Sequence, residues 1–138
     1  MNRILIFHYH DTAGNEKRMA PAYYMDAEYD KVAVRIYAET APLRDAIFNI
    51  YNDGVSIFSN RTSRAWDIST GEEITGAADT NVCLAAGDNS DEMADDFNNI
   101  TIEEGSFVYC NLIDTGGGKN FTVQLELSPL SEGESGED

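Results

Sequence analysis

The sequence contains little positive charge. Lysine and arginine together number 9, against 25 aspartate and glutamate residues, so the formal net charge at pH 7 is −16. Proteins that bind phosphate backbones or anionic membranes need clustered basic side chains to displace counterions. Arg61 and Arg64 lie close together, but acidic residues surround them along the sequence. Nucleic acid and membrane surfaces are therefore excluded as expected partners.

Cysteine and long apolar runs are also scarce. Cys83 and Cys110 are the only cysteines, which excludes a disulfide framework of the secreted type. No apolar run approaches the roughly 18 residues of a membrane-spanning helix, and residues 1–10 lack the features of a signal peptide. We therefore expect a protein kept in a cytosol-like compartment. Both cysteines fall on inward strand positions and are predicted to be buried free thiols.

The residues needed for catalysis or metal binding are few. His8 and His10 are the only histidines, and no Gly-x-Ser-x-Gly motif accompanies them, so we predict no enzyme, no catalytic residue and no cofactor. Acidic residues are abundant enough to leave glycosidase chemistry open by count alone. Two imidazoles make an incomplete metal ligand set. The acidic run 88–96 lacks the spacing of a calcium loop, so no metal site is predicted, with calcium there as the open alternative.

Short runs of β-branched and aromatic residues, separated by turn residues, dominate the chain. Residues 46–51 and 55–58 flank Asp53 and Gly54, which supply the positive φ angles of a tight hairpin turn. A second hairpin is predicted from 107–114 and 120–127, with Thr115–Lys119 as its flexible tip. In it, alternate residues should face the core. A helical turn is expected at 90–97, where the first residues are acidic. Further strands are expected at 3–9, 22–27, 31–38, 82–85 and 100–102.

These strands predict an all-β fold, a jelly-roll-like antiparallel β-sandwich, with a barrel as the alternative. At 138 residues the chain fits one domain, which we place at residues 1–127. Residues 128–138 are rich in Ser, Glu, Gly and Asp, which predicts a flexible acidic tail. The polar segment 59–81 is predicted to be a long connection that contacts a partner.

Candidate partner-binding residues are the aromatic and basic side chains that a partner could contact. Aromatic residues and arginine are enriched in the centres of protein interfaces. The candidates are Trp66, Arg61, Arg64, Tyr37 and Tyr51.

Five segments follow one another in a distinctive order. They are VAVRIYAETAP at 32–42, FNIYNDGVSIF at 48–58, LAAG at 84–87, EGSFVYC at 104–110 and NFTVQL at 120–125. In this order they resemble the β-sandwich domain that recurs in bacteriophage head, tail and fibre proteins. This sequence departs from that family's pattern at four positions, which bear on subfamily rather than on fold: Asn49, Asp53, Ser106 and Cys110.

The resemblance implies a non-enzymatic structural protein of the virion, assembled in the host cytoplasm and without a cofactor. A capsid-decorating or head-fibre protein that docks on the major capsid protein is the main interpretation. A tail-associated module that binds a receptor or carbohydrate, such as a host-surface glycan, is the alternative. Homotrimers are common among such relatives, so a homotrimer is a further expectation.

Overall fold

A computed structural model describes residues 2–9, 17–58, 65–67, 73–74, 82–94, 97–98 and 100–130. All regular elements in these ranges are strands, and no helix that could cross a membrane occurs among them. The strands are β1 (Arg3–Tyr9), β2 (Lys17–Tyr24), β3 (Tyr29–Thr40), β4 (Ala46–Asn52), β5 (Val55–Ser56), β6 (Ala65–Asp67), β7 (Glu73–Ile74), β8 (Val82–Leu84), β9 (Ser90–Met93), β10 (Phe107–Asp114) and β11 (Lys119–Pro129).

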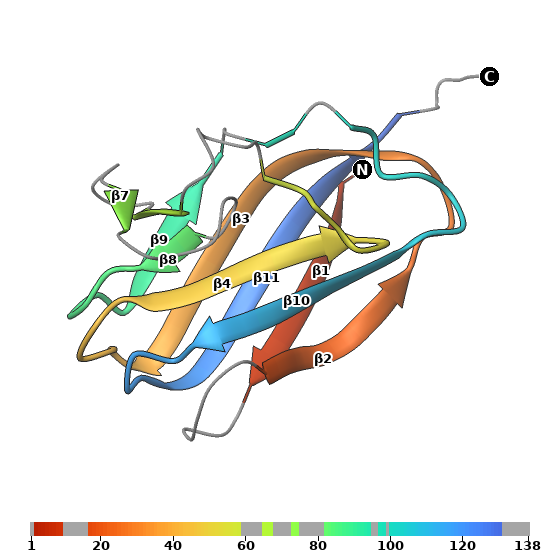
Figure 1. Cartoon of the computed structure of the whole chain (residues 1–138). Helices are drawn as coiled ribbons and strands as arrows, with labels where there is room; N and C mark the ends of the chain where they lie inside the picture. Colours follow the sequence, from red (N-terminus) through yellow and green to blue (C-terminus); the bar gives the residue numbers. More distant parts are fainter. Residues whose placement is uncertain are drawn as a thin grey trace.

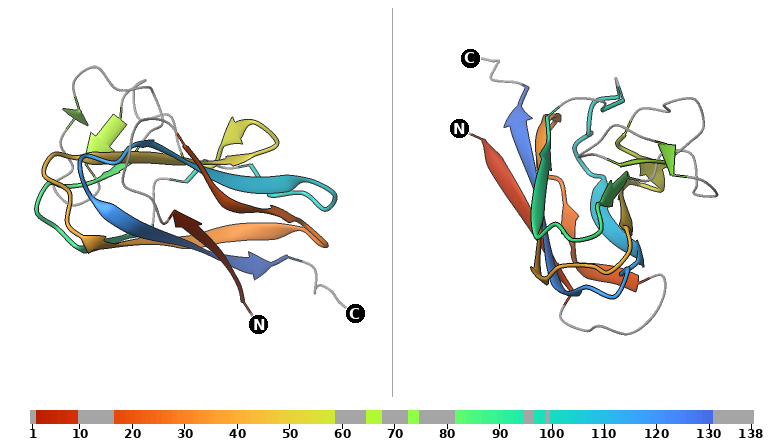
Figure 2. Two further views of the ribbon diagram at one scale, coloured as in Figure 1. Left: turned by 90° about the horizontal axis from the view of Figure 1, so that it is seen from below. Right: turned by 90° about the vertical axis from the view of Figure 1, so that its left-hand side faces the viewer.

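The strands form two layers that face each other (Figure 1; Figure 2). Sheet A has the order β2-β1-β11-β3-β9, and sheet B has the order β7-β6-β8-β4-β10-β2, with β5 paired to β4. Strand β2 pairs with both β1 and β10, so it joins the sheets along one edge. All pairs are antiparallel except β6 with β8. The predicted all-β sandwich is confirmed.

The core lies between the sheets and is built mainly from alternate residues of the long strands, while all three residues of β8 are buried. Side chains on successive residues of a strand point to opposite faces, so every second one in β10 and β11 faces this core. Phe7 and Phe121 fill the core from sheet A, and Phe48 fills it from sheet B. The predicted inward residues of β10 and β11 are all buried: Val108, Cys110, Leu112, Phe121, Val123, Leu125 and Leu127.

A tyrosine hydroxyl forms hydrogen bonds to the backbone of β1 at the point where β1 diverges from β2. The two strands share one backbone pair, His8 with Ala20. Farther along, the hydroxyl of Tyr23 donates to the carbonyl of Ile6 at 2.8 Å and accepts from the Ile6 N–H at 3.2 Å. Since backbone groups away from water need partners, this side chain substitutes for a strand at the corner of the sandwich.

The first predicted hairpin is confirmed. β4 and β5 pair through Tyr51 with Ser56 and Asn52 with Val55. Between them Asp53 has a φ of 50° and Gly54 a φ of 85°, as a tight primed turn requires.

The second predicted hairpin is wrong. β10 pairs with β2 and β4, whereas β11 pairs with β1 and β3, so residues 115–118 carry the chain from one sheet to the other. This connection is not a flexible tip. The carbonyl of Gly116 accepts hydrogen bonds from the N–H groups of Leu43 and Arg44, at 2.8 and 3.0 Å. A Cβ at Gly116 would lie 2.0 Å from the carbonyl oxygen of Arg44.

The predicted helical turn at 90–97 is also wrong. Ser90–Met93 forms β9, which pairs with β3 at the edge of sheet A. Met93 is buried, and Ser90 and Glu92 are exposed, which is strand alternation. The predicted strand at 100–102 is reduced to one bridge, Ile102 with Tyr29.

Two predicted segments fall partly outside the described residues. Of the predicted connection 59–81, residues 65–67 and 73–74 form β6 and β7, and the others lie outside the described residues. Of the predicted tail, Ser128 and Pro129 continue β11, while residues 131–138 lie outside the described residues.

Candidate functional site

The outer face of sheet A carries an open groove of about 440 Å³ on strands β3, β9 and β11. We call it the binding groove. It is lined by Arg35, Ile36, Tyr37, Ser90, Asp91, Glu92, Thr122 and Gln124.

Strand register brings the polar side chains of the binding groove together. Tyr37 of β3 lies beside Thr122 of β11 and Ser90 of β9. In the next outward row, Arg35 lies beside Gln124 and Glu92. Because the intervening residues point into the core, these six side chains share one solvent-facing surface. The groove is therefore formed by side chains of the sheet rather than by a loop.

Tyr37 provides the apolar surface of the groove. Its side chain is 51% exposed, although large aromatic residues usually bury most of their area. Beside it, Thr122 lies within hydrogen-bonding distance of His8, with 3.1 Å between Oγ1 and the imidazole Nδ1. An aromatic face thus lies among hydroxyl, imidazole and amide groups, which can donate and accept hydrogen bonds.

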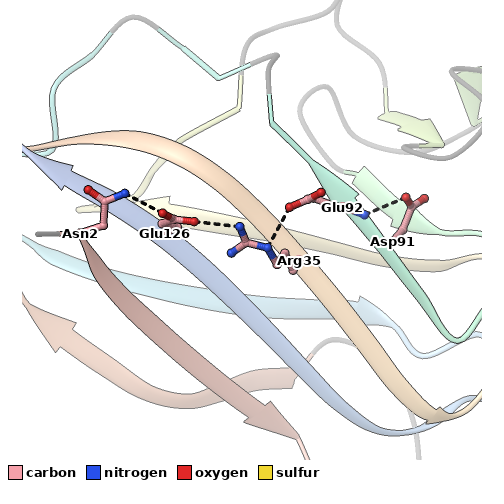
Figure 3. A network of polar contacts seen from close by, with 5 residues as sticks. All are labelled: Asn2, Arg35, Asp91, Glu92 and Glu126. Carbon is pink, nitrogen blue, oxygen red and sulfur yellow. Dashed lines mark hydrogen bonds and ion pairs between the residues drawn. The ribbon is translucent and has the colours of Figure 1, made fainter.

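Arg35 is fixed between two carboxylates. Its Nε donates to Oε2 of Glu92 and its Nη2 donates to Oε1 of Glu126, both at 2.8 Å. Asn2 in turn donates to the other oxygen of Glu126 at 2.6 Å, and the N–H of Glu92 donates to Asp91 at 2.8 Å (Figure 3). This chain of contacts holds the guanidinium against the sheet surface.

The same contacts set the charges of the groove. The hydrogen bond from Asn2 and then that from Arg35 lower the pKa of Glu126 below its ordinary value. The bond to Glu126, with a smaller contribution from Glu92, raises the pKa of Arg35. Glu126 is thus an ionised acceptor, unlike the proton-donating carboxylic acid that general acid catalysis requires.

Metal-ligand geometry is not found in the described part of the chain. No group of three or more His, Cys, Asp and Glu side chains that could hold an ion occurs there. Within the acidic run 88–96, Asn89 donates to the carbonyl of Ala38 and residues 90–93 form β9. Asp95, Asp96 and His10 lie outside the described residues.

A second exposed surface lies on the outer face of sheet B. Tyr51 and Tyr109 are cross-strand neighbours whose rings stack with centroids 5.4 Å apart. Beside them, Tyr24 meets Phe107 edge to face, also at 5.4 Å. Tyr24 is 56% exposed and Phe107 48% exposed. We call Tyr24, Phe107, Tyr109 and Tyr51 the aromatic strip.

The predicted partner-binding residues do not form one site. Tyr37 lines the binding groove and Tyr51 belongs to the aromatic strip, on opposite sheets. The backbone of Trp66 lies in β6, paired with Val82 of β8, and Arg61 and Arg64 lie outside the described residues.

Sequence reasoning did not select Arg35, Glu92, Thr122 and Gln124. The alternation of residues 31–38 and 120–127 already places Arg35, Thr122 and Gln124 on outward positions, and that was the signal available. These side chains come together only because β3 pairs with β11 and β9. That pairing cannot be inferred from the sequence pattern.

No protein-family model matches the sequence, and no curated protein matches it. The structure is similar to the CBM36-1 domain, a carbohydrate-binding module of a multidomain xylanase from the hindgut metagenome of Trinervitermes trinervoides. The TM-score is 0.51 at 9% sequence identity, over 94% of this chain and 99% of that one. At this identity the similarity establishes a shared β-sandwich fold. It does not establish a shared function, which must be argued from the site.

Two further carbohydrate-binding modules are more distant. A CBM36 module in complex with calcium and xylotriose has a TM-score of 0.42 at 10% identity, over 88% of this chain and 78% of that one. A family 35 module from Clostridium thermocellum has a TM-score of 0.37 at 11% identity, over 94% of this chain and 92% of that one.

Proposed function

We propose that this protein is a non-catalytic module that binds carbohydrate in the binding groove of sheet A. The observation that carries the proposal is the exposed ring of Tyr37, set among hydrogen-bonding side chains on paired strands. A sugar ring presents C–H faces that pack on an aromatic ring and hydroxyl groups that need polar partners. The fold shared with the xylanase module supports this interpretation.

The groove supplies both kinds of contact in a preorganised form. Gln124 can donate and accept through its amide and Thr122 through its hydroxyl, and Arg35 can donate through Nη1, the nitrogen not used by its carboxylate partners. Hydrogen bonds to charged groups contribute about 1.5–3 kcal/mol each, roughly twice the value for neutral pairs. Since these side chains stand on strands, little ordering cost opposes binding.

Substitution of Tyr37 tests the proposal. Wild-type protein is applied to a glycan array, and the binding constant for the selected oligosaccharide is measured by titration calorimetry. We expect Tyr37→Ala to weaken binding by at least about tenfold, or 1.4 kcal/mol. The matched control is Tyr24→Ala, which removes a ring of similar exposure, 56% against 51%, from the aromatic strip and should leave sugar affinity unchanged. Failure of the wild type to bind any glycan would refute the proposal.

Our second candidate function is docking within a bacteriophage particle, as a capsid-decorating, head-fibre or tail-associated protein. The order of the five sequence segments supports it, and so does the aromatic strip. Exposed clusters of large apolar side chains are typical of protein-binding surfaces. We propose that the strip contacts a capsid or tail protein, with the virion as the location.

Location in the particle tests this second candidate. Gold labelling or cryo-EM density of purified virions should place the protein on the particle, and Tyr24→Ser with Phe107→Ser should reduce its incorporation while Tyr37→Ala does not. Absence of the protein from purified virions would exclude this role. Multi-angle light scattering of the purified protein tests the expected homotrimer.

A further inference from the structure

The binding groove carries more negative than positive charge. Arg35 is the only cationic side chain among its described lining residues, whereas Glu92 on the same outward face is acidic. Glu126, directly beyond Arg35, adds a second carboxylate. The formal charge of −16 on the whole chain has the same sign.

The side-on pair of N–H donors of Arg35 is not available to a ligand carboxylate. Arginine binds carboxylates best through two parallel N–H bonds from its planar fork. Here Nε is engaged by Glu92 and Nη2 by Glu126. An incoming carboxylate could gain the side-on pair of bonds only by displacing one of these acidic residues, at a distance where it is repelled by both.

The same geometry suits a neutral ligand. Nη1 of Arg35 makes no hydrogen bond to the residues that the structure describes, and it can donate to a hydroxyl oxygen without loss of either ion pair. The carboxylate oxygens accept hydrogen bonds from hydroxyl groups, which a carboxylate or sulfate ligand could not donate. The carboxylates of Glu92 and Glu126 beside Arg35 therefore attract hydroxyl groups and repel anions.

We infer that the binding groove selects uncharged glycans and excludes those that carry uronic acid or sulfate groups. Glu92 and Glu126 occupy two donor nitrogens of Arg35, and their two negative charges exceed its single positive charge. This inference rests on the proposed carbohydrate-binding function and specifies its ligand class. Selectivity of this kind comes from repulsion of the wrong ligand as much as from contacts with the right one.

A glycan array with neutral, uronate-containing and sulfated oligosaccharides of matched length tests the inference. We expect wild-type protein to bind neutral members at least about tenfold more tightly than anionic ones. The affinity for neutral members should change by less than about twofold between 0.01 and 1 M sodium chloride, although the screening length falls from about 30 to 3 Å. Preference for an anionic or cationic glycan, or a steep fall in affinity with salt, would overturn the inference.

Removal of the two carboxylates provides a second test. Glu92→Gln with Glu126→Gln keeps the size of both side chains and frees the charge of Arg35. Binding of uronate-containing glycans should increase by at least about tenfold, and unchanged rejection by the folded variant would overturn the inference. Circular dichroism and the unfolding midpoint establish folding. The proposed function fails separately if Tyr37→Ala binds neutral glycans as well as the wild type does.

Discussion

Arg35 reaches diagonally across sheet A to Glu126, with 2.8 Å between Nη2 and Oε1, although the backbone partner of Arg35 on β11 is Gln124. The diagonal contact ties two rows of outward side chains together. Gln124 lies directly beside Arg35 and lines the binding groove. The contact therefore contributes to the shape of the groove as well as to its charge.

The first prediction concerns the ionisation of Glu126. Asn2→Ala and Arg35→Gln should each raise the pKa of Glu126 toward its ordinary value of 4.5, because each removes a hydrogen bond to the charged form. Carbon-13 NMR titration of the side-chain carboxyl measures this pKa. Since the pKa is lower in the folded protein than in the unfolded chain, the stabilising effect of this carboxylate is complete above the unfolded value. It is lost as the pH falls through the folded value. An unchanged pKa in both variants would contradict the network.

The second prediction concerns Tyr23. Tyr23→Phe should lower the free energy of unfolding by about 1–3 kcal/mol, because the N–H and carbonyl of Ile6 both lose their hydroxyl partner. The control is Tyr24→Phe, whose exposed side chain lies next along the chain and whose substitution should change stability by less than about 0.5 kcal/mol. Chemical denaturation measures both. An equal change in the free energy of unfolding for the two substitutions would mean that the hydrogen bonds from the Tyr23 hydroxyl to Ile6 do not stabilise the fold.

The third prediction compares two glycines with positive φ. Gly54→Ala should cost about 1–2 kcal/mol, the ordinary penalty for a left-handed backbone, because a Cβ there meets nothing within 4 Å. Gly116→Ala should cost at least about 3 kcal/mol, since the added carbon also collides with the carbonyl of Arg44. Thermal unfolding of the two variants would show whether residues 115–118 are as tightly packed as described.

The fourth prediction concerns the two thiols. Cys83 and Cys110 are both fully buried, and burial raises the pKa of Cys110 far above that of a free thiol. Because the thiolate is the reactive form, neither cysteine should react with a thiol reagent in the native state at pH 8. Both should react at once in guanidinium chloride. Rapid labelling of the native protein would contradict the predicted burial, and the unfolded sample controls for the reagent.

The core was largely predictable from the sequence, whereas the partners of the strands were not. Alternation placed Val108 and Leu112, like Val123 and Leu125, on inward positions, and all are buried. That pattern is the same whether the two strands pair in one sheet or face each other across the core. The contacts between Gly116 and the backbone of Leu43 and Arg44 distinguish the two arrangements, and they depend on a loop more than 70 residues away in sequence.

The candidate site was predictable in part. Tyr37 was a candidate from residue type, and it lines the groove. The sequence predicts a helical turn at Glu92, because acidic residues at 91 and 92 suit the start of a helix. Tertiary pairing of β9 with β3 overrides that local preference and brings Glu92 to Arg35. Ion pairs between residues so distant along the chain leave no periodic signal in a single sequence.

β1 pairs along its whole length with β11, from Arg3 with Leu127 to Tyr9 with Phe121. The ribosome adds about 5–20 residues per second, so the first strand waits several seconds for its main partner to be synthesised. Throughout that time Leu5 and Phe7, which are fully buried in the folded protein, lack the strand that will flank them in sheet A. Sheet A is therefore completed only after β11 has been synthesised, so β1 gains its full native pairing late.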